Sequence, residues 1–301
     1  MSLLVETSAD ELRNKEHMLT LESPKFSADS PSVSIVHERG RGIAWRIWPA
    51  AHVLTEWLQT NKDIFQGEKI FVEIGAGVGL AGIVCAGLGG ITAITDLGEC
   101  LDALSRSKAA NTYGLQSRLR VLPLTFGNFH EIAKVVESMR HEFAMPNAEI
   151  VVLGSDLVYF ESLFIPLAQT MREFALKFNA DIFLAYKKRI YKNEKRFFHK
   201  IIPQHSLDVD VILQTTVHEI DPTSQHADGR VILDLSVSQS TEDWNTRIFR
   251  IKKANLWREL PSAPVLKQGK ESSSSPETSV SEKKQKKGKI PCTQEKRGRI
   301  R

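Results

Sequence analysis

The sequence of 301 residues has few cysteines and no long hydrophobic run. Its three cysteines, Cys85, Cys100 and Cys292, form no close pair such as C-x-x-C, and its nine histidines show no ligand spacing, so no metal site is expected. No apolar segment approaches the ~20 residues that cross a bilayer, and no basic-then-apolar signal segment stands at the N-terminus. We therefore expect an intracellular protein of a reducing compartment, in the cytoplasm or also in the nucleus, with no membrane partner.

The formal charge of +4 is distributed unevenly along the chain. Residues 261–301 contain eleven Lys/Arg and four Asp/Glu, a net charge of +7, which leaves −3 for residues 1–260. The tail is rich in serine and lysine and cannot bury a core, so we expect it to be disordered. Because the remainder is mildly acidic, nucleic acid is not the expected partner. The expected divisions are a partly disordered extension at 1–31, one domain at 32–260 and the tail.

From residue 33 onward, apolar strand-like segments alternate with longer helical segments, among them one from Trp48 to about Asn61 and another over Leu80–Leu88. The candidate strands are Val33–Val36, Ile70–Ile74, Ile91–Thr95, Leu119–Leu124, Ile150–Gly154, Asp181–Tyr186, Val209–Glu219, Arg230–Val237 and Arg247–Ile251. This alternation predicts an α/β fold with a doubly wound, mostly parallel sheet that binds its ligand at the carboxyl ends of the strands.

A glycine-rich turn directly follows the apolar segment Ile70–Ile74 and reads Gly75-Ala76-Gly77-Val78-Gly79. Glycine turns tightly and lets the backbone approach a ligand, so a strand, this turn and a helix N-terminus together are typical of a nucleotide-type cofactor site. Glu73 precedes the first glycine by two residues, as in motif I (E/D-x-G-x-G-x-G) of S-adenosylmethionine-dependent methyltransferases. Asp96 ends the next apolar segment, where an acid accepts hydrogen bonds from ribose hydroxyls.

Two alternatives remain open at this motif. Gly77, Gly79 and Gly82 also match the dinucleotide pattern G-x-G-x-x-G, which on its own is a weak signal. The glycines could also only shape a turn.

A second motif follows the apolar segment that ends at Ser155, and it reads Asp156-Leu157-Val158-Tyr159, or D-x-x-Y. With the glycine turn, Trp48-Pro49-Ala50-Ala51 and Thr95-Asp96-Leu97, it resembles the seven-β-strand protein-lysine methyltransferases of family 16. The resemblance is greatest to the methyltransferase-like 21 subgroup, which includes the valosin-containing-protein lysine methyltransferase, and spans about Val33 to Lys253. It implies a class I (Rossmann-like) fold of seven strands. The candidate strands after Tyr186 are one too many for that fold, so an insertion near 221–245 is expected.

The resemblance also implies roles for individual residues. S-adenosyl-L-methionine is the implied cofactor, with contacts from Trp48, Glu73, Gly75, Ala76, Gly77, Asp96, Phe126 and Ser155. Phe126 stands where the family usually has tryptophan, so an aromatic face is kept but the indole donor is lost. Ser155 stands where alanine is usual. Tyr186-Lys187-Lys188-Arg189 resembles the family's Y-x-x-R after the fifth strand.

Asp156 and Tyr159 match the signature motif and are the predicted catalytic pair. Methyl transfer to an amine needs a desolvated donor and an aligned, neutral acceptor, but no metal. Both residues would hydrogen-bond and orient the lysine ammonium. Alternatively Asp156 could cap a helix from Ser162 onward, Tyr159 could be an aromatic at the edge of the core, and Trp48 could be an ordinary core residue.

The resemblance implies transfer of a methyl group to a lysine of a protein, with a chaperone, AAA ATPase or translation factor as substrate and a monomer as enzyme. One alternative is methylation of a nucleic acid or small molecule, although the two prolines of the N/D-P-P-Y base pocket are absent. Another is a non-catalytic cofactor-binding module, which the Phe126 departure slightly favours. A nicotinamide oxidoreductase explains neither Trp48 nor D-x-x-Y.

Overall fold

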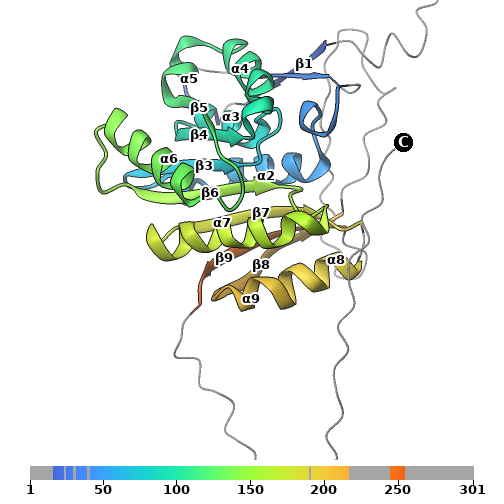
Figure 1. Cartoon of the computed structure of the whole chain (residues 1–301). Coiled ribbons are helices and arrows are strands. Elements are labelled where there is room, and N and C mark those ends of the chain that lie inside the picture. The colour runs from blue at the N-terminus through green and yellow to red at the C-terminus, as the bar shows by residue number, and fades with distance from the viewer. Residues whose placement is uncertain are drawn as a thin grey trace, which may run out of the picture. The chain divides into compact units, whose positions relative to one another are not determined.

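Figure 1 shows the computed structural model, which describes residues 16–23, 25–29, 32–38, 41–189, 191–216 and 245–254. Three predictions lie wholly or largely outside these residues: the disordered tail at 261–301, the strand Arg230–Val237 and the insertion near 221–245. None of the helices in the described ranges is long and apolar enough to cross a membrane.

Among the described residues, seven strands form the main sheet, in the order β5-β4-β3-β6-β7-β9-β8. They are β3 (Lys69–Ile74), β4 (Ile91–Asp96), β5 (Leu119–Pro123), β6 (Glu149–Ser155), β7 (Asp181–Lys187), β8 (Leu207–Thr215) and β9 (Thr246–Lys253). The strands β3 to β7 are parallel, whereas β9 runs antiparallel between β7 and β8. The strand order reverses at β3, which lies between β4 and β6. The predicted class I fold with a doubly wound, mostly parallel sheet of seven strands is therefore confirmed.

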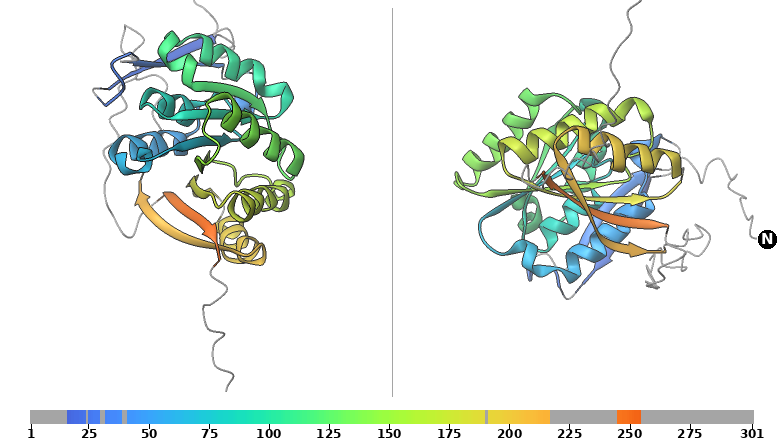
Figure 2. Two further views of the ribbon diagram at one scale, coloured as in Figure 1. Left: turned by 90° about the vertical axis from the view of Figure 1, so that its left-hand side faces the viewer. Right: turned by 90° about the horizontal axis from the view of Figure 1, so that it is seen from below.

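Helices cover both faces of the sheet (Figures 1 and 2). They are α2 (Pro49–Thr60), α3 (Leu80–Gly87), α4 (Leu101–Ala109), α5 (Tyr113–Arg118), α6 (Phe129–Glu142), α7 (Phe164–Lys177), α8 (Tyr191–Arg196) and α9 (Ile202–Gln204), with the π-helical turn η5 (Phe197–Ile201) between the last two. Short 3-10 turns are η1 (Ile43–Trp45), η2 (Lys62–Phe65), η3 (Gly98–Cys100) and η4 (Glu161–Leu163).

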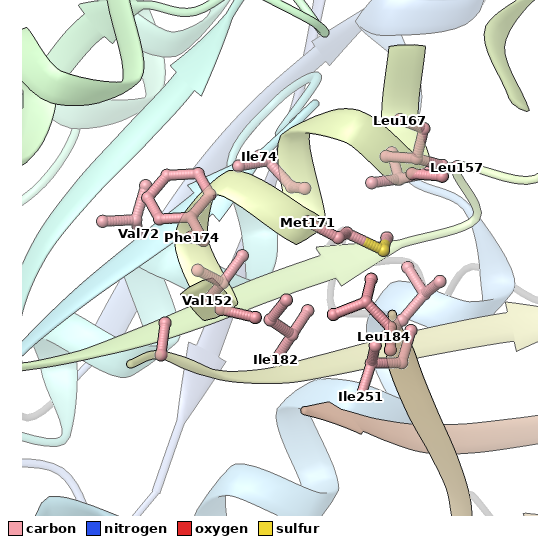
Figure 3. Packing of buried hydrophobic residues seen from close by; sticks show 14 of the residues in the cluster. Val72, Ile74, Val152, Leu157, Leu167, Met171, Phe174, Ile182, Leu184 and Ile251 are labelled. Atoms are coloured by element: carbon pink, nitrogen blue, oxygen red, sulfur yellow. The ribbon is translucent and has the colours of Figure 1, made fainter. Parts of the chain in front are cut away.

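The central strands are mostly apolar because both of their faces are covered. Val72 of β3 points into the cluster formed with α6 and α7, whereas its neighbour Phe71 packs on the opposite face with α2. Figure 3 shows the first cluster, in which Met171 and Phe174 of α7 lie over Val152 of β6. This packing fixes the carboxyl ends of the strands, where the loops that follow β3, β4 and β6 meet.

A separate two-stranded antiparallel sheet joins β1 (Glu16–Glu22) to β2 (Ser32–Glu38). The strand β2 contains the predicted Val33–Val36, and β1 lies within the segment 1–31, which we expected to be a partly disordered extension. The sequence there does not show the apolar–polar alternation of a half-buried strand, because the apolar Met18, which is 60% exposed, stands beside the buried Leu19. The small sheet is attached to α4, since the Val36 amide donates to the Ser107 hydroxyl at 3.1 Å.

Candidate active site

A cavity of about 370 Å³ lies at the carboxyl edge of the sheet, where the loops after β3, β4 and β6 converge. Nine of the ten predicted site residues line it: Trp48, Gly75, Ala76, Gly77, Asp96, Phe126, Ser155, Asp156 and Tyr159. Its volume falls in the range of small-molecule sites, roughly 300–1,000 Å³. Sequence motifs that are more than a hundred residues apart thus meet at one site.

The glycine turn after β3 has a backbone that other residues adopt at a cost. Gly75, Gly77 and Gly79 have φ angles of +58°, +59° and +82°. A Cβ atom on Gly77 would lie 3.1 Å from the carbonyl oxygen of Ala44, and one on Gly75 would lie 2.7 Å from the Leu157 side chain. The turn is therefore packed closely against η1 and against the loop after β6, and only glycine leaves the cavity open there.

Asp96, at the end of β4, is held by the turn that it faces. Its Oδ2 accepts a hydrogen bond from the Gly77 amide at 2.7 Å, and its Oδ1 accepts one from the Leu97 amide at 2.7 Å. Burial raises the pKa of this carboxyl, while the two amides oppose the rise. The carboxylate is fixed in orientation and lines the cavity, as expected of a group that binds a diol.

Glu73 is the predicted site residue that does not line the cavity, so its predicted contact with a cofactor does not agree with its position. Its side chain points from β3 into the protein, and its Oε2 accepts a hydrogen bond from the Gly82 amide of α3 at 2.7 Å. Burial raises the pKa of Glu73 to about 8, against the opposing effect of the Gly82 amide. We conclude that Glu73 fastens the first turn of α3 to β3 and so shapes the glycine turn from behind.

Asp156 lies in a left-handed conformation, with φ of +56°, and is almost fully buried. Its Oδ1 accepts hydrogen bonds from the Lys187 amide at 3.1 Å and from Nη1 of Arg189 at 2.8 Å. Its Oδ2 accepts from the Ala50 amide at 3.3 Å and from Nη2 of Arg189 at 3.0 Å. These four bonds occupy the roughly four lone-pair positions of a carboxylate.

The surroundings of Asp156 change the interpretation of the signature motif. No lone pair of the carboxylate is left for a lysine ammonium while Arg189 holds this position. The Ala50 amide belongs to the first turn of α2, so Asp156 caps that helix from a distant part of the chain and not the helix after Ser162. Asp156 is thus a positioning residue in this structure, and the predicted direct contact with the acceptor remains a prediction.

Trp48 and Tyr159 also line the cavity, as aromatic residues. The Trp48 indole donates to the Ile43 carbonyl at 3.0 Å, and the guanidinium carbons of Arg46 and Arg189 lie 4.2 Å and 5.1 Å from its ring. Tyr159 is half-buried, and burial raises the pKa of its hydroxyl, with the Asp96 charge contributing in the same direction. The hydroxyl is therefore neutral at physiological pH, and Tyr159 lines the cavity.

Phe126 and Ser155 lie where the resemblance predicts them. Phe126 is half-buried and packs against the main core, with its ring tip 3.0 Å from a Cβ built on Gly75. Ser155, the last residue of β6, lines the cavity beside Asp156. Sequence reasoning noted Arg189 within Y-x-x-R but did not place it in the site, and it missed Arg46 and Cys100, which also line the cavity. The signal for Arg189 was the basic segment directly after a buried strand.

The described residues contain no cluster of three or more His, Cys, Asp or Glu side chains that could hold a metal ion. The site residues fit a metal-free transfer, because they provide a glycine turn, a fixed carboxylate and aromatic walls.

Comparison with known proteins identifies the family. Residues 27–204 match the model of the lysine methyltransferase family. A Mus musculus protein, EEF1A lysine methyltransferase 3, is 32% identical over 216 residues, which cover 68% of this chain and 87% of that protein. Protein N-lysine methyltransferase METTL21A of Danio rerio is 30% identical over 180 residues, or 59% of this chain and 76% of that protein. The solved glycopeptide N-methyltransferase MtfA has a TM-score of 0.42 at 10% identity, covering 68% of this chain and 90% of that one.

The family model covers more than half of the chain, and the mouse relative is matched over most of its length. The chain therefore belongs to the lysine methyltransferase family, in its METTL21 group, and is an S-adenosylmethionine-dependent enzyme that methylates lysine side chains of proteins.

Proposed function

We propose that the cavity at the carboxyl edge of the sheet binds S-adenosyl-L-methionine directly and that the enzyme methylates a lysine of EEF1A. The observation that carries the first part is the convergence of the glycine turn, the Asp96 carboxylate and the loop after β6 on one cavity. The name of the mouse relative supports the second part.

The chain's own residues fit the proposed cofactor. Gly75, Ala76 and Gly77 line the cavity, and there is little room for a Cβ on either glycine, so the turn presents its backbone to the cofactor. Asp96 presents a carboxylate that is already oriented for ribose hydroxyls. Phe126 offers an aromatic face for adenine. When bound, the cofactor supplies an electrophilic methyl group on a sulfonium. The residues around it exclude water and hold it in one orientation, so that transfer to a bound acceptor becomes effectively unimolecular.

The acceptor must arrive as a neutral amine. A lysine with a pKa near 10.4 lies about 3.4 units above pH 7, which corresponds to roughly 4.6 kcal/mol. Arg46 places a positive charge at the acceptor end of the cavity, where like charge and burial lower the pKa of an incoming amine, whereas the charge of Arg189 is balanced by Asp156. Tyr159 can accept a hydrogen bond from that amine through its neutral hydroxyl oxygen, or face it with its ring.

Asp156 acts on this arrangement indirectly. By binding the Arg189 guanidinium on two atoms and the Ala50 amide, it fixes Arg189, the start of α2 and hence Trp48 relative to one another. We assign it the role of a positioning residue. Tyr159 is the residue that contacts the acceptor.

The proposal is tested with EEF1A purified from cells that lack the enzyme, incubated with the full chain and isotopically labelled S-adenosyl-L-methionine. We expect label on one lysine, located by mass spectrometry, and calorimetric binding of S-adenosyl-L-homocysteine but not of NAD. Binding of NAD and not of the methyl donor would overturn the cofactor. Binding of the methyl donor with no label on EEF1A would overturn only the substrate.

A further inference from the structure

A strongly basic segment lies beside the acceptor end of the cavity. Residues 187–196, from the last residue of β7 to the end of α8, contain six Lys/Arg and one Glu, a net charge of +5. The rest of residues 1–260 carries a net charge of −8, so the positive charge of this domain is concentrated here. In Figure 1, α8 lies at the carboxyl end of β7, which is the edge that carries the cavity.

Both ends of this segment are attached to the loop after β6, which carries Tyr159. At one end, Arg189 binds Asp156 and lines the cavity. At the other end, Arg196 forms an ion pair with Glu161, two residues beyond Tyr159. The helix α8 is therefore linked at both of its ends to the loop that carries Tyr159.

One face of α8 is basic and directed toward that loop. Lys192, Lys195 and Arg196 stand at positions i, i+3 and i+4, so their side chains share a face of the helix. The ion pair between Arg196 and Glu161 shows that this face points toward the loop after β6. Asn193 and Phe197, on the other side, are buried. Lys192 and Lys195 are exposed, and neither has an ion pair with any residue in the described ranges.

Arg46 extends the same charge across the mouth of the cavity. It is exposed and stacks on Trp48, whose ring also lies near Arg189. Of the two acids that line the cavity, Asp156 is already paired with Arg189, and Asp96 stands at the end of β4. We name the set of Arg46, Lys188, Lys192 and Lys195 the basic rim.

We propose that the basic rim is the docking surface for an acidic surface of the substrate protein, so that the methylated lysine is one flanked by Asp and Glu residues. The inference rests on the proposed function, in that the acceptor lysine enters the cavity at its Tyr159 end. Oppositely charged surfaces accelerate encounter and fix orientation. A rim of this sign would also repel lysines in basic surroundings, which gives selectivity among the many lysines of a cell.

A nucleic acid is the other polyanion that a basic surface could hold. We favour an acidic protein as the partner of the rim, because the acceptor of this enzyme family is a lysine side chain and the rim lies at the point where that side chain would enter. Phe160, the neighbour of Tyr159, is 54% exposed. Its ring can contact an apolar residue on the surface of a substrate protein, or the aliphatic stem of the acceptor lysine.

The test uses the full chain with Lys192→Glu and Lys195→Glu together, and a matched control with Lys62→Glu and Lys177→Glu. Both control residues are exposed and precede the starts of β3 and β7, so they lie at the sheet edge opposite to the cavity, with the same change of charge. Each chain is incubated with labelled S-adenosyl-L-methionine and a protein extract from cells that lack the enzyme. Labelled lysines and their rates are measured by mass spectrometry.

We expect the labelled lysines of the unaltered chain to have neighbouring Asp or Glu residues. Labelling should slow about tenfold in the rim variant, through KM and not kcat, with this difference shrinking at high salt. The control should label at the original rate, and S-adenosyl-L-homocysteine should bind all three chains equally. Equal rates in the rim variant and the control, or labelled lysines in basic surroundings, would overturn the inference while leaving the methyltransferase assignment intact.

Two further outcomes are informative. If the unaltered chain binds a single-stranded RNA of mixed sequence, and the rim variant loses RNA binding but not lysine labelling, the rim is a nucleic-acid surface and the inference is wrong. If the unaltered chain binds S-adenosyl-L-homocysteine but labels no lysine, both the proposed acceptor site and the docking surface fall.

Discussion

Asp156 and Arg189 form a bidentate ion pair, with Oδ1 2.8 Å from Nη1 and Oδ2 3.0 Å from Nη2. The carboxylate is almost fully buried, with 2% of its side chain exposed, while the guanidinium is 34% exposed. Asp156 ends the β6 segment and Arg189 follows β7, so the pair ties together two neighbouring strand ends at the acceptor side. The residue that sequence motifs mark as catalytic is, in this structure, fully engaged in holding the site together.

Alanine at Asp156 should reduce single-turnover methyl transfer by about a hundredfold, because misplacement of site groups costs rates of that order. The affinity for S-adenosyl-L-homocysteine should change much less, since Asp156 makes no hydrogen bond to the glycine turn after β3 or to Asp96 of β4. If Asp156 acts through Arg189, Arg189→Ala should cause a similar loss and the double variant should lose little more. Single-turnover rates and calorimetry on the three variants measure this.

Arg189→Lys is the control for this cycle. Lysine keeps the charge but cannot bind both carboxylate oxygens, so it should restore only part of the activity. Additive losses in the double variant would instead mean that Asp156 contacts the acceptor independently of Arg189. Normal turnover with a lowered melting temperature would make Asp156 only a cap of α2.

Glu73→Gln should change how stability depends on pH. The pKa of Glu73 is raised by burial from 4.5 to about 8 in the folded state, so its stabilising effect is fully present below pH 4.5 and is lost as the pH rises to 8. Glutamine stays neutral and can still accept the Gly82 amide. The variant should therefore gain stability relative to the unaltered chain across this range, by on the order of a few kcal/mol.

Melting temperatures from pH 4.5 to 8.5 check this prediction. Glu149→Gln is the control, since Glu149 is an exposed acid on β6 with 75% of its side chain accessible. If the melting temperatures of Glu73→Gln and of the unaltered chain changed with pH in the same way, Glu73 would be ionised in the folded protein over this range.

Phe126→Trp should maintain or tighten binding of S-adenosyl-L-homocysteine. The aromatic ring lines the cavity next to Gly75, and an indole adds area and a hydrogen-bond donor. Phe126→Leu, which removes the aromatic face, should weaken binding. Calorimetry on both variants is the measurement, and a clear loss in the tryptophan variant would mean that Phe126 does not take the position of the family's tryptophan.

The sequence was sufficient to predict the sheet because β3, β4, β6 and β7 are continuous apolar segments, which only burial on both faces explains. It was also sufficient to bring nine site residues to one edge, since the carboxyl ends of parallel strands meet there. The sequence did not predict the position of the Glu73 side chain, because motif I shows that an acid is needed and not which way its side chain points. In a strand, that direction depends on the pleat and on the amide to which the carboxylate binds.

The role of Arg189 was missed for a related reason. A bidentate ion pair between residues 33 positions apart depends on the packing of β6 against β7, and no local spacing encodes it. The strand β1 was missed because Leu19 and Leu21 alone carry its apolar pattern, and its pairing with β2 supplies the remaining stabilisation.

A chain that ends at Glu259 should bind S-adenosyl-L-homocysteine and transfer methyl groups as the full chain does. The last strand of the described residues, β9, ends at Lys253, and the Ala254 amide donates to the Ser206 carbonyl at 2.9 Å. The basic segment from Pro261 onward should instead affect location or partner encounter through its charge. Calorimetry and transfer assays on the shortened chain test this. Loss of cofactor binding would show that the tail contributes to the fold.

Gly77→Arg should abolish cofactor binding without unfolding the protein. Gly77 has a φ of +59°, donates its amide to Asp96 at 2.7 Å and would place a Cβ 3.1 Å from the Ala44 carbonyl oxygen. Gly77 and Ala44 both line the cavity, so a long side chain at Gly77 would crowd it. Gly89→Arg is the matched control, because Gly89 has a φ of +99° with open space around its Cβ position, in the turn between α3 and β4. Both changes carry the left-handed backbone cost of about 1–2 kcal/mol. Both melting temperatures should therefore fall modestly, while only Gly77→Arg loses binding of S-adenosyl-L-homocysteine.

If Gly77→Arg does not fold, Gly77→Ala replaces it, with a weaker loss of affinity expected. Equal loss of binding at Gly77 and Gly89 would mean that general strain and not the cavity accounts for the effect, and the cofactor would have to bind elsewhere.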